Sequence, residues 1–95
     1  MKIEQIEVFL LDGGSPGWRP IVCLVSTEEG IYGYGEASVG FDTGASASFN
    51  MIREVAPFVI GKDPTATEAL WDTMYTQTFW AQGGGTVMFS AISAI

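Results

Sequence analysis

Few side chains in this 95-residue sequence could do acid–base, nucleophilic or metal chemistry. No histidine is present, and histidine is the commonest general base and metal ligand in proteins. The 11 acidic residues are scattered, and no pair has the spacing of a metal site on one helix or strand. Ser90 and Ser93 have no base in this chain to activate them. We therefore predict that the chain itself holds no catalytic residue and no metal ligand.

Two glycine-rich stretches match nucleotide-binding motifs only in part. Gly30, Gly33 and Gly35 are spaced G-x-x-G-x-G inside an expected strand, whereas a dinucleotide fingerprint is G-x-G-x-x-G at a strand-to-helix turn. Residues 83–85 are glycines that precede an expected helix and could offer backbone N–H groups to an anion. The lysine of a phosphate loop is missing there, so a hinge is the better interpretation.

Large side chains on irregular segments are the candidates for contact with a ligand, because such loops commonly carry function. They are Trp18 and Arg19 in the Gly/Pro-rich loop 12–20, Phe41 in the loop 40–44, and Trp80 after the second expected helix. The guanidinium of Arg19 could bind a carboxylate or several hydroxyl groups. The alternative is that Trp18 and Phe41 pack on their own domain and that Arg19 is solvated.

The charge distribution excludes some partners. The net charge is −7, and the four basic residues Lys2, Arg19, Arg53 and Lys62 are scattered. No cationic track exists to bind phosphates, so we expect neither nucleic acid nor an anionic membrane surface as a partner. Without a signal-peptide pattern or an apolar run of about 20 residues, the chain is expected to be soluble and cytoplasmic. The single cysteine, Cys23, is predicted to be a small buried apolar residue.

Periodicity predicts an α+β fold that begins with a three-stranded antiparallel meander. The expected strands are residues 2–12, 20–27 and 31–39, and a hairpin turn at 28–30 joins the last two. Apolar residues occupy both faces at the far end of the first strand, which predicts cover on both sides there. The third strand places glycines on one face and Tyr32, Tyr34 and Glu36 on the other.

Helices follow the strands and are expected to form a small bundle. The first helix is predicted over residues 45–59, with Pro57 ending or kinking it and Gly61 capping it. Thr65 and Glu68 match a capping box for the second helix. Thr86 is expected to cap the third helix, whose apolar stripe is Met88, Ala91, Ile92 and Ile95.

The composition favours a domain that docks on something else. Hydrophobic residues make up 47% of the chain and charged residues 16%, which is more apolar surface than one small domain needs. The third helix stops inside its apolar stripe at Ile95. The expectation is therefore that residues 1–95 form one N-terminal domain whose last helix was cut within a longer protein.

Six stretches in order resemble the N-terminal capping domain of the enolase superfamily, in its mandelate racemase and muconate lactonizing enzyme branch. They are residues 1–3, Val25-Ser26-Thr27-Glu28-Glu29-Gly30, Gly33-Tyr34-Gly35-Glu36-Ala37, residues 60–64, Leu70-Trp71-Asp72-Thr73-Met74-Tyr75, and residues 90–95. The stretch from Met74 to Gly84 is most similar to acid-sugar dehydratases of the galactonate type.

The resemblance implies a parent enzyme that uses Mg²⁺ to remove the proton α to a carboxylate, with an acid-sugar dehydratase as the expected member. Its metal ligands and acid–base groups would lie in a C-terminal (β/α) barrel outside this chain, and the enzyme would be a homo-oligomer. Two loops of the family's N-terminal domain contact the substrate, and they correspond to residues 13–19 and 40–43 here. The alternatives are a racemase, an epimerase or a cycloisomerase of the same superfamily, or a stand-alone interaction module.

Overall fold

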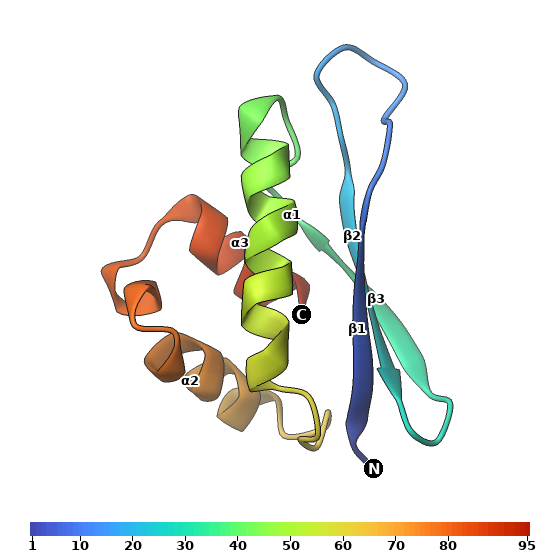
Figure 1. Cartoon of the computed structure of the whole chain (residues 1–95), viewed down its shortest axis with the longest axis vertical. Coiled ribbons are helices and arrows are strands. Elements are labelled where there is room, and N and C mark those ends of the chain that lie inside the picture. The colour runs from blue at the N-terminus through green and yellow to red at the C-terminus, as the bar shows by residue number, and fades with distance from the viewer.

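Three short strands build the sheet that opens the fold. The computed structural model describes residues 1–95, with β1 (Ile3–Leu10), β2 (Ile21–Thr27) and β3 (Tyr32–Ala37) forming an antiparallel sheet in the order β1-β2-β3 (Figure 1). The predicted meander is confirmed. Each strand is shorter than predicted, because residues at its ends belong to the loops and turns.

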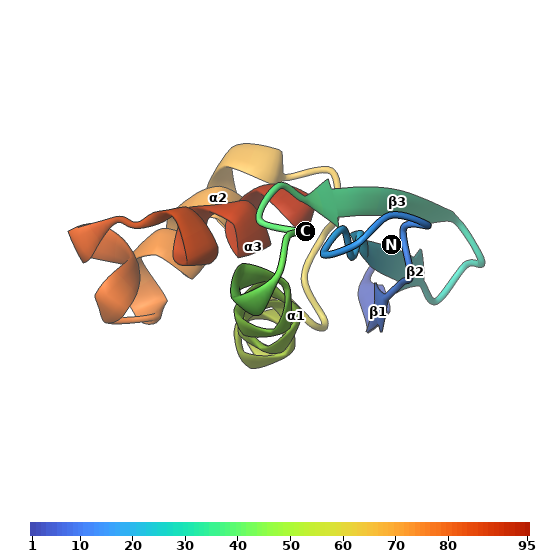
Figure 2. The same ribbon diagram turned by 90° about the horizontal axis from the view of Figure 1, so that it is seen from above.

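The inner face of the sheet forms part of the core, and the outer face is open. Ile21, Cys23 and Ala37 lie on the inner face and are no more than 1% exposed. On the outer face Phe9 is 40% exposed and Tyr34 is 68% exposed. The prediction that both sides of the far end of β1 are covered is therefore wrong for this chain, since no helix lies over the outer face (Figure 2).

All the helices pack on the inner side of the sheet. Their order along the chain is α1 (Thr43–Val55), the 3₁₀ turn η1 (Ala56–Phe58), α2 (Thr67–Gln77), the 3₁₀ turn η2 (Trp80–Gly83) and α3 (Thr86–Ala94). Helices α1 and α3 contact the strands, whereas α2 lies farther out, beside α3 and η1 (Figures 1 and 2). None of these helices combines the length and the hydrophobicity that crossing a membrane requires.

Proline ends the first helix, as its place in the sequence predicts. The α-helical hydrogen bonding stops at Val55, and the chain continues as the 3₁₀ turn that contains Pro57. The helix is therefore shorter at this end than the predicted 45–59 and begins two residues earlier. Gly61 then adopts a φ of 84°, the left-handed conformation that glycine tolerates best.

The predicted side-chain caps of α2 and α3 are wrong. The Thr65 hydroxyl donates to Oδ1 of Asp63 at 2.8 Å. Ala66, one residue later, occupies the N-cap position of α2 without a side-chain bond, and Glu68 caps nothing. Thr86 is the first residue of α3, and Gly85 occupies the N-cap position without a side-chain bond. In both cases the helix begins one residue away from the expected position, and the residues at the N-cap positions, Ala66 and Gly85, have no side-chain oxygen to accept a bond.

The third helix carries the apolar stripe that its sequence predicts. Met88, Ala91 and Ile92 are all less than 9% exposed. Where α1 and α3 cross, the buried hydroxyls of Ser48 and Ser90 lie 3.4 Å apart, and the Ser90 hydroxyl donates to the carbonyl oxygen of Val87 at 3.0 Å. Small residues at this crossing let the two helices approach closely while the larger side chains fill the core on either side.

Candidate functional site

The loop between β1 and β2 is an ordered extension of its hairpin. The N–H of Leu11 donates to the carbonyl oxygen of Pro20 at 2.8 Å, and the N–H of Gly13 donates to that of Trp18 at 2.9 Å. The Trp18 ring lies on the loop backbone, because a Cβ added at Gly13 would come within 2.6 Å of ring atoms. These main-chain bonds and the ring contact hold the glycine-rich loop in one shape.

The loop between β3 and α1 pairs with it through main-chain atoms. The N–H of Arg19 donates to the carbonyl oxygen of Gly40 at 2.7 Å, and the N–H of Asp42 donates to that of Gly17 at 2.8 Å. Trp18 and Phe41 thus face each other in a short antiparallel bridge. Both loops lie at the upper end of the molecule in Figure 1. We call this pair of segments, residues 13–19 and 40–42, the loop clasp.

Sequence reasoning missed two positions that shape the loop clasp. Gly17 has a φ of 81°, and a Cβ there would lie 2.8 Å from both the Phe41 ring and Oδ1 of Asp42. Asp42 itself has a φ of 51°, a conformation that costs a non-glycine residue about 1–3 kcal/mol and is concentrated at functional sites. The high glycine content of these loops was the only feature of the sequence that indicated unusual backbone conformations, and it did not identify Asp42.

Arg19 presents an unpaired positive charge on the first loop of the loop clasp. Its side chain is exposed, and the only ion pair in the structure joins the N-terminus to Glu29 at 3.7 Å. The adjoining hollow of about 560 Å³ is lined by residues of the first loop, including Trp18 and Arg19. Trp18 is 45% exposed and Phe41 58% exposed. An aromatic surface with a free guanidinium could bind a carboxylate or a polyhydroxylated group.

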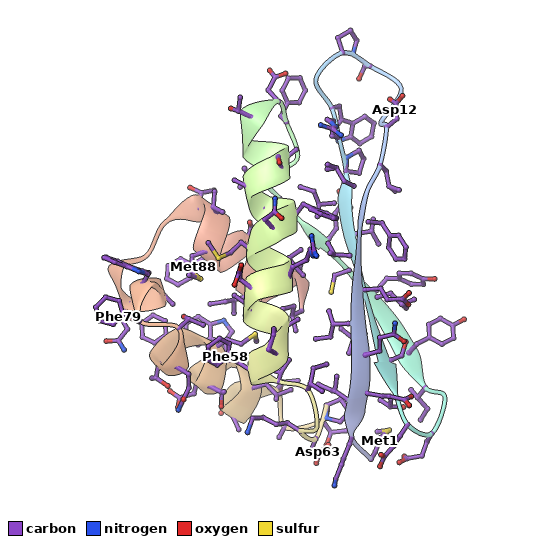
Figure 3. The ribbon with its side chains drawn as sticks, in the orientation of Figure 1. Met1, Asp12, Phe58, Asp63, Phe79 and Met88 are labelled. Atoms are coloured by element: carbon purple, nitrogen blue, oxygen red, sulfur yellow. The ribbon has the colours of Figure 1, made fainter.

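The fourth predicted contact residue, Trp80, lies elsewhere. It packs edge-on against Phe79, with 4.9 Å between ring centroids, and both side chains are about three-quarters exposed, at 74% and 75%. They border a hollow with Met51, Phe58 and Met88. Figure 3 shows Phe79 far across the molecule from Asp12, which directly precedes the loop clasp. The structure therefore brings together Trp18, Arg19 and Phe41 and leaves Trp80 apart.

Neither the cysteine nor the carboxylates form a reactive centre. Cys23 is fully buried, and burial raises the pKa of its thiol to about 11, so it is neutral and serves as a packing residue, as predicted. No three histidine, cysteine, aspartate or glutamate side chains gather where they could hold a metal ion. The residues of this chain do not fit a Mg²⁺ site.

Comparison with known proteins places this fold in a family. The family model for the mandelate racemase / muconate lactonizing enzyme N-terminal domain matches residues 17–95. A D-galactonate dehydratase from Xanthomonas campestris pv. campestris (strain B100) is 35% identical over all 95 residues, which span 22% of that protein's length.

Solved structures agree with this match. A proposed dehydratase from Zymomonas mobilis ZM4 superposes with a TM-score of 0.92 at 49% identity, over 98% of this chain and 24% of that one. A proposed galactarate dehydratase from Agrobacterium radiobacter, solved with sodium and L-malate bound, has a TM-score of 0.81 at 26% identity, over 99% of this chain and 22% of that one. The chain therefore belongs to the mandelate racemase / muconate lactonizing enzyme family of the enolase superfamily and is its N-terminal domain.

Proposed function

We propose that this chain is the domain that closes the active site and selects the substrate in an acid-sugar dehydratase. Two observations support a dehydratase over a racemase, an epimerase or a cycloisomerase: the D-galactonate dehydratase relative and the dehydratase assignments of similar structures. A stand-alone interaction module is disfavoured, because the chain spans only 22% of that curated relative.

The chemistry proposed for the parent enzyme is removal of the proton α to a carboxylate, followed by loss of water. The Mg²⁺ ion that the family implies would be held outside these residues, since no cluster here could hold it. Acid–base groups would likewise come from the barrel domain that follows. The proposed roles of this chain are to exclude water from the reacting groups and to hold the far end of the substrate.

The observation that carries the proposal is the loop clasp. Main-chain hydrogen bonds join its two loops, so we propose that they cover the substrate as one unit. In that role the rings of Trp18 and Phe41 would shut out water, and Arg19 would bind a second carboxylate or hydroxyl groups of the sugar acid. The Arg19 guanidinium makes no ion pair within the chain, which leaves its donors available to an anionic or hydroxyl-rich ligand.

Arg19→Ala and Trp18→Ala in the full-length enzyme test these roles. If they contact the substrate, each change lowers kcat/KM by at least about tenfold, or ~1.4 kcal/mol, with little change in melting temperature. Arg53→Ala is the matched control, because Arg53 is also an exposed arginine but lies on α1 over the Phe49 ring, 5.7 Å from its centroid.

Two results would contradict the proposal. One is an unchanged kcat/KM in both variants, with a lower melting temperature for Trp18→Ala, which would make Trp18 a packing residue only. The other is an equal loss of kcat/KM for Arg19→Ala and Arg53→Ala, which would indicate a general charge effect. From the same family resemblance we infer a cytoplasmic homo-oligomer, and sedimentation of the full-length enzyme measures its assembly state.

A further inference from the structure

Asp42 holds a backbone conformation that the fold does not require of an aspartate. Its φ of 51° and ψ of −131° are strained for a residue with a Cβ, and the chain uses glycine at other positive-φ positions, such as Gly14 and Gly17. The bond that joins Asp42 to the first loop comes from its main-chain N–H, which a glycine would supply equally well. Pairing of the two loops therefore does not account for the side chain at this position.

The carboxylate of Asp42 does not serve the helix that follows it. Asp42 occupies the N-cap position of α1, where an aspartate usually accepts a hydrogen bond from the first turn, but it makes no side-chain cap bond. It makes no ion pair either, since the only one in the structure joins the N-terminus to Glu29. Its Oδ1 lies instead beside Gly17, where an added Cβ would come within 2.8 Å of it. The side chain is thus turned toward the first loop, with its oxygens free to accept.

The first loop adds a second carboxylate and the guanidinium. Asp12 and Arg19 both line the hollow of about 560 Å³, and Gly17, beside the Asp42 carboxylate, lines it as well. Asp12 accepts one bond from the N–H of Gly14 at 3.0 Å, and it makes no ion pair with Arg19. Opposite charges that border one hollow without pairing leave both donors and acceptors available to a ligand.

This set of groups distinguishes a hydroxyl-rich ligand from a carboxylate. A guanidinium only donates hydrogen bonds and an ionised carboxylate only accepts them, whereas a hydroxyl group does both. Hydroxyl groups at the far end of a sugar acid could therefore bond to Arg19, Asp12 and Asp42. A second carboxylate could bond only to the guanidinium and would be repelled by both aspartates. No other basic residue lies between Lys2 and Arg53 in the sequence to offset that repulsion.

We propose that Asp42 is a specificity-determining residue, and that it makes the loop clasp select monocarboxylic sugar acids, whose far end carries hydroxyl groups, over dicarboxylic ones. The inference rests on the proposed function and narrows it, because it assigns Arg19 to hydroxyl groups rather than to a second carboxylate. Closure over a dicarboxylate would leave the two aspartates without donors where water is excluded, and unpaired acceptors are costly there. Closure over hydroxyl groups would satisfy them.

Paired substrates test this selection in the full-length enzyme. Each five- or six-carbon aldonic acid is compared with the aldaric acid that results when its far CH₂OH group is oxidised to a carboxylate. For the substrate that the enzyme uses best, we expect kcat/KM to be at least about 100-fold higher for the aldonic acid than for its aldaric partner.

Asp42→Asn should lower that ratio at least about tenfold, because the amide removes one repelling charge and can donate to a carboxylate. Asparagine also tolerates a positive φ, so this variant keeps the loop conformation. Glu68→Gln is the matched control. It removes one exposed carboxylate from α2, at the opposite end of the molecule from the loop clasp (Figure 1), and should leave the ratio unchanged.

Asp42→Gly separates recognition from structure. This variant should lose the selection without a lower melting temperature, because glycine relieves the strain at a positive φ. An aspartate held only for structure would give the opposite result, a lower melting temperature with the same ratio, and that result would overturn the inference.

The remaining outcomes distinguish the inference from the proposed function. A wild-type enzyme that prefers aldaric acids, or a ratio that Asp42→Asn leaves unchanged, would overturn the inference and leave the proposed function standing. An equal fall of the ratio in Glu68→Gln would also overturn it, since a general charge effect would then be the cause. A wild-type enzyme that turns over neither class would overturn the proposed function and this inference with it.

Discussion

Gly17 is the residue on which the geometry of the loop clasp depends most. Its φ of 81° is strained for any side chain, and a Cβ would also lie 2.8 Å from the Phe41 ring and from Oδ1 of Asp42. We expect Gly17→Ala to lower the free energy of unfolding by about 2–3 kcal/mol, since backbone strain and a displaced loop add together.

Gly14→Ala is the matched control for this change, because Gly14 has a φ of 84° but open space around it. Gly14→Ala should lower the free energy of unfolding by about 1 kcal/mol, because it strains the backbone without displacing a neighbouring side chain. Urea unfolding of the full-length enzyme measures both. Equal losses in the two variants would contradict a role for Gly17 in seating the second loop.

Cys23 makes stability depend on pH in the alkaline range. Burial raises the pKa of its thiol from 9.0 to about 11, so the unfolded chain loses this proton at a lower pH than the folded chain. Its contribution is fully present below about pH 9, falls as the pH rises from 9 to 11, and totals about 2–3 kcal/mol. Cys23→Ala should remove this part of the loss of stability between pH 9 and 11. The free energy of unfolding is measured against pH under reducing conditions for both proteins, and parallel curves would contradict the prediction.

At the scale of elements, side-chain bonds hold the turn that leads into α2 and leave the first turn of the helix itself without a side-chain cap. Asp63 accepts bonds from the Thr65 N–H at 2.9 Å and from the Thr65 hydroxyl at 2.8 Å. These bonds lower the pKa of the Asp63 carboxyl below its ordinary value of 3.8. Since the folded-state pKa is the lower one, this stabilisation is present above that ordinary value and is lost as the pH falls toward the shifted one.

Asp63→Ala should therefore lower the melting temperature more than Glu68→Ala at neutral pH. A capping box would give comparable losses, because each of its side chains satisfies one free N–H group. Thermal unfolding of the full-length enzyme followed by circular dichroism distinguishes the two. A larger loss for Glu68→Ala would restore the capping box.

The elements themselves were predictable where one face is buried. The apolar stripe of α3 follows from packing on the core, which leaves the helical period in the sequence, and β2 stands out as a short unbroken apolar run between Pro20 and a hairpin turn. The caps were not predictable, since each helix begins one residue away from the position that its threonine would cap. Each loop of the candidate site could be recognised in the sequence by itself, but the pairing of the two loops could not. The contact of Trp18 with Phe41 joins segments that the sequence shows only as separate irregular loops, and nothing local sets Trp80 apart.

At the scale of the whole molecule, the chain leaves much apolar surface in water. The outer face of the sheet is open, and Trp71, Tyr75 and Phe89 form a stacked group with 5.1–6.3 Å between ring centroids. Of these, Trp71 is 44% exposed, and the separate pair of Phe79 and Trp80 is more exposed still. Both β1 and β3 are edge strands with free backbone groups, which favour association with other chains.

We therefore expect residues 1–95, expressed alone, to self-associate or to unfold at low temperature. Burial of one large side chain contributes roughly 1.5–3 kcal/mol, a large share of the stability of a small domain. Sedimentation and thermal unfolding of the isolated chain measure both properties. A monodisperse monomer with a cooperative transition would contradict this expectation and would show that the exposed rings are tolerated in water.

The hydrogen bonds that join the two loops of the loop clasp come from peptide groups and from no side chain. Such bonds are indifferent to which residues stand at positions 18, 19 and 41, provided that Gly13 and Gly17 remain. Under the proposed function, pairing of the loops and recognition of the ligand are encoded by different residues. A lineage could exchange one sugar acid for another by changing three side chains and still inherit the same closure, which makes this corner of the fold a natural place for new specificities to evolve.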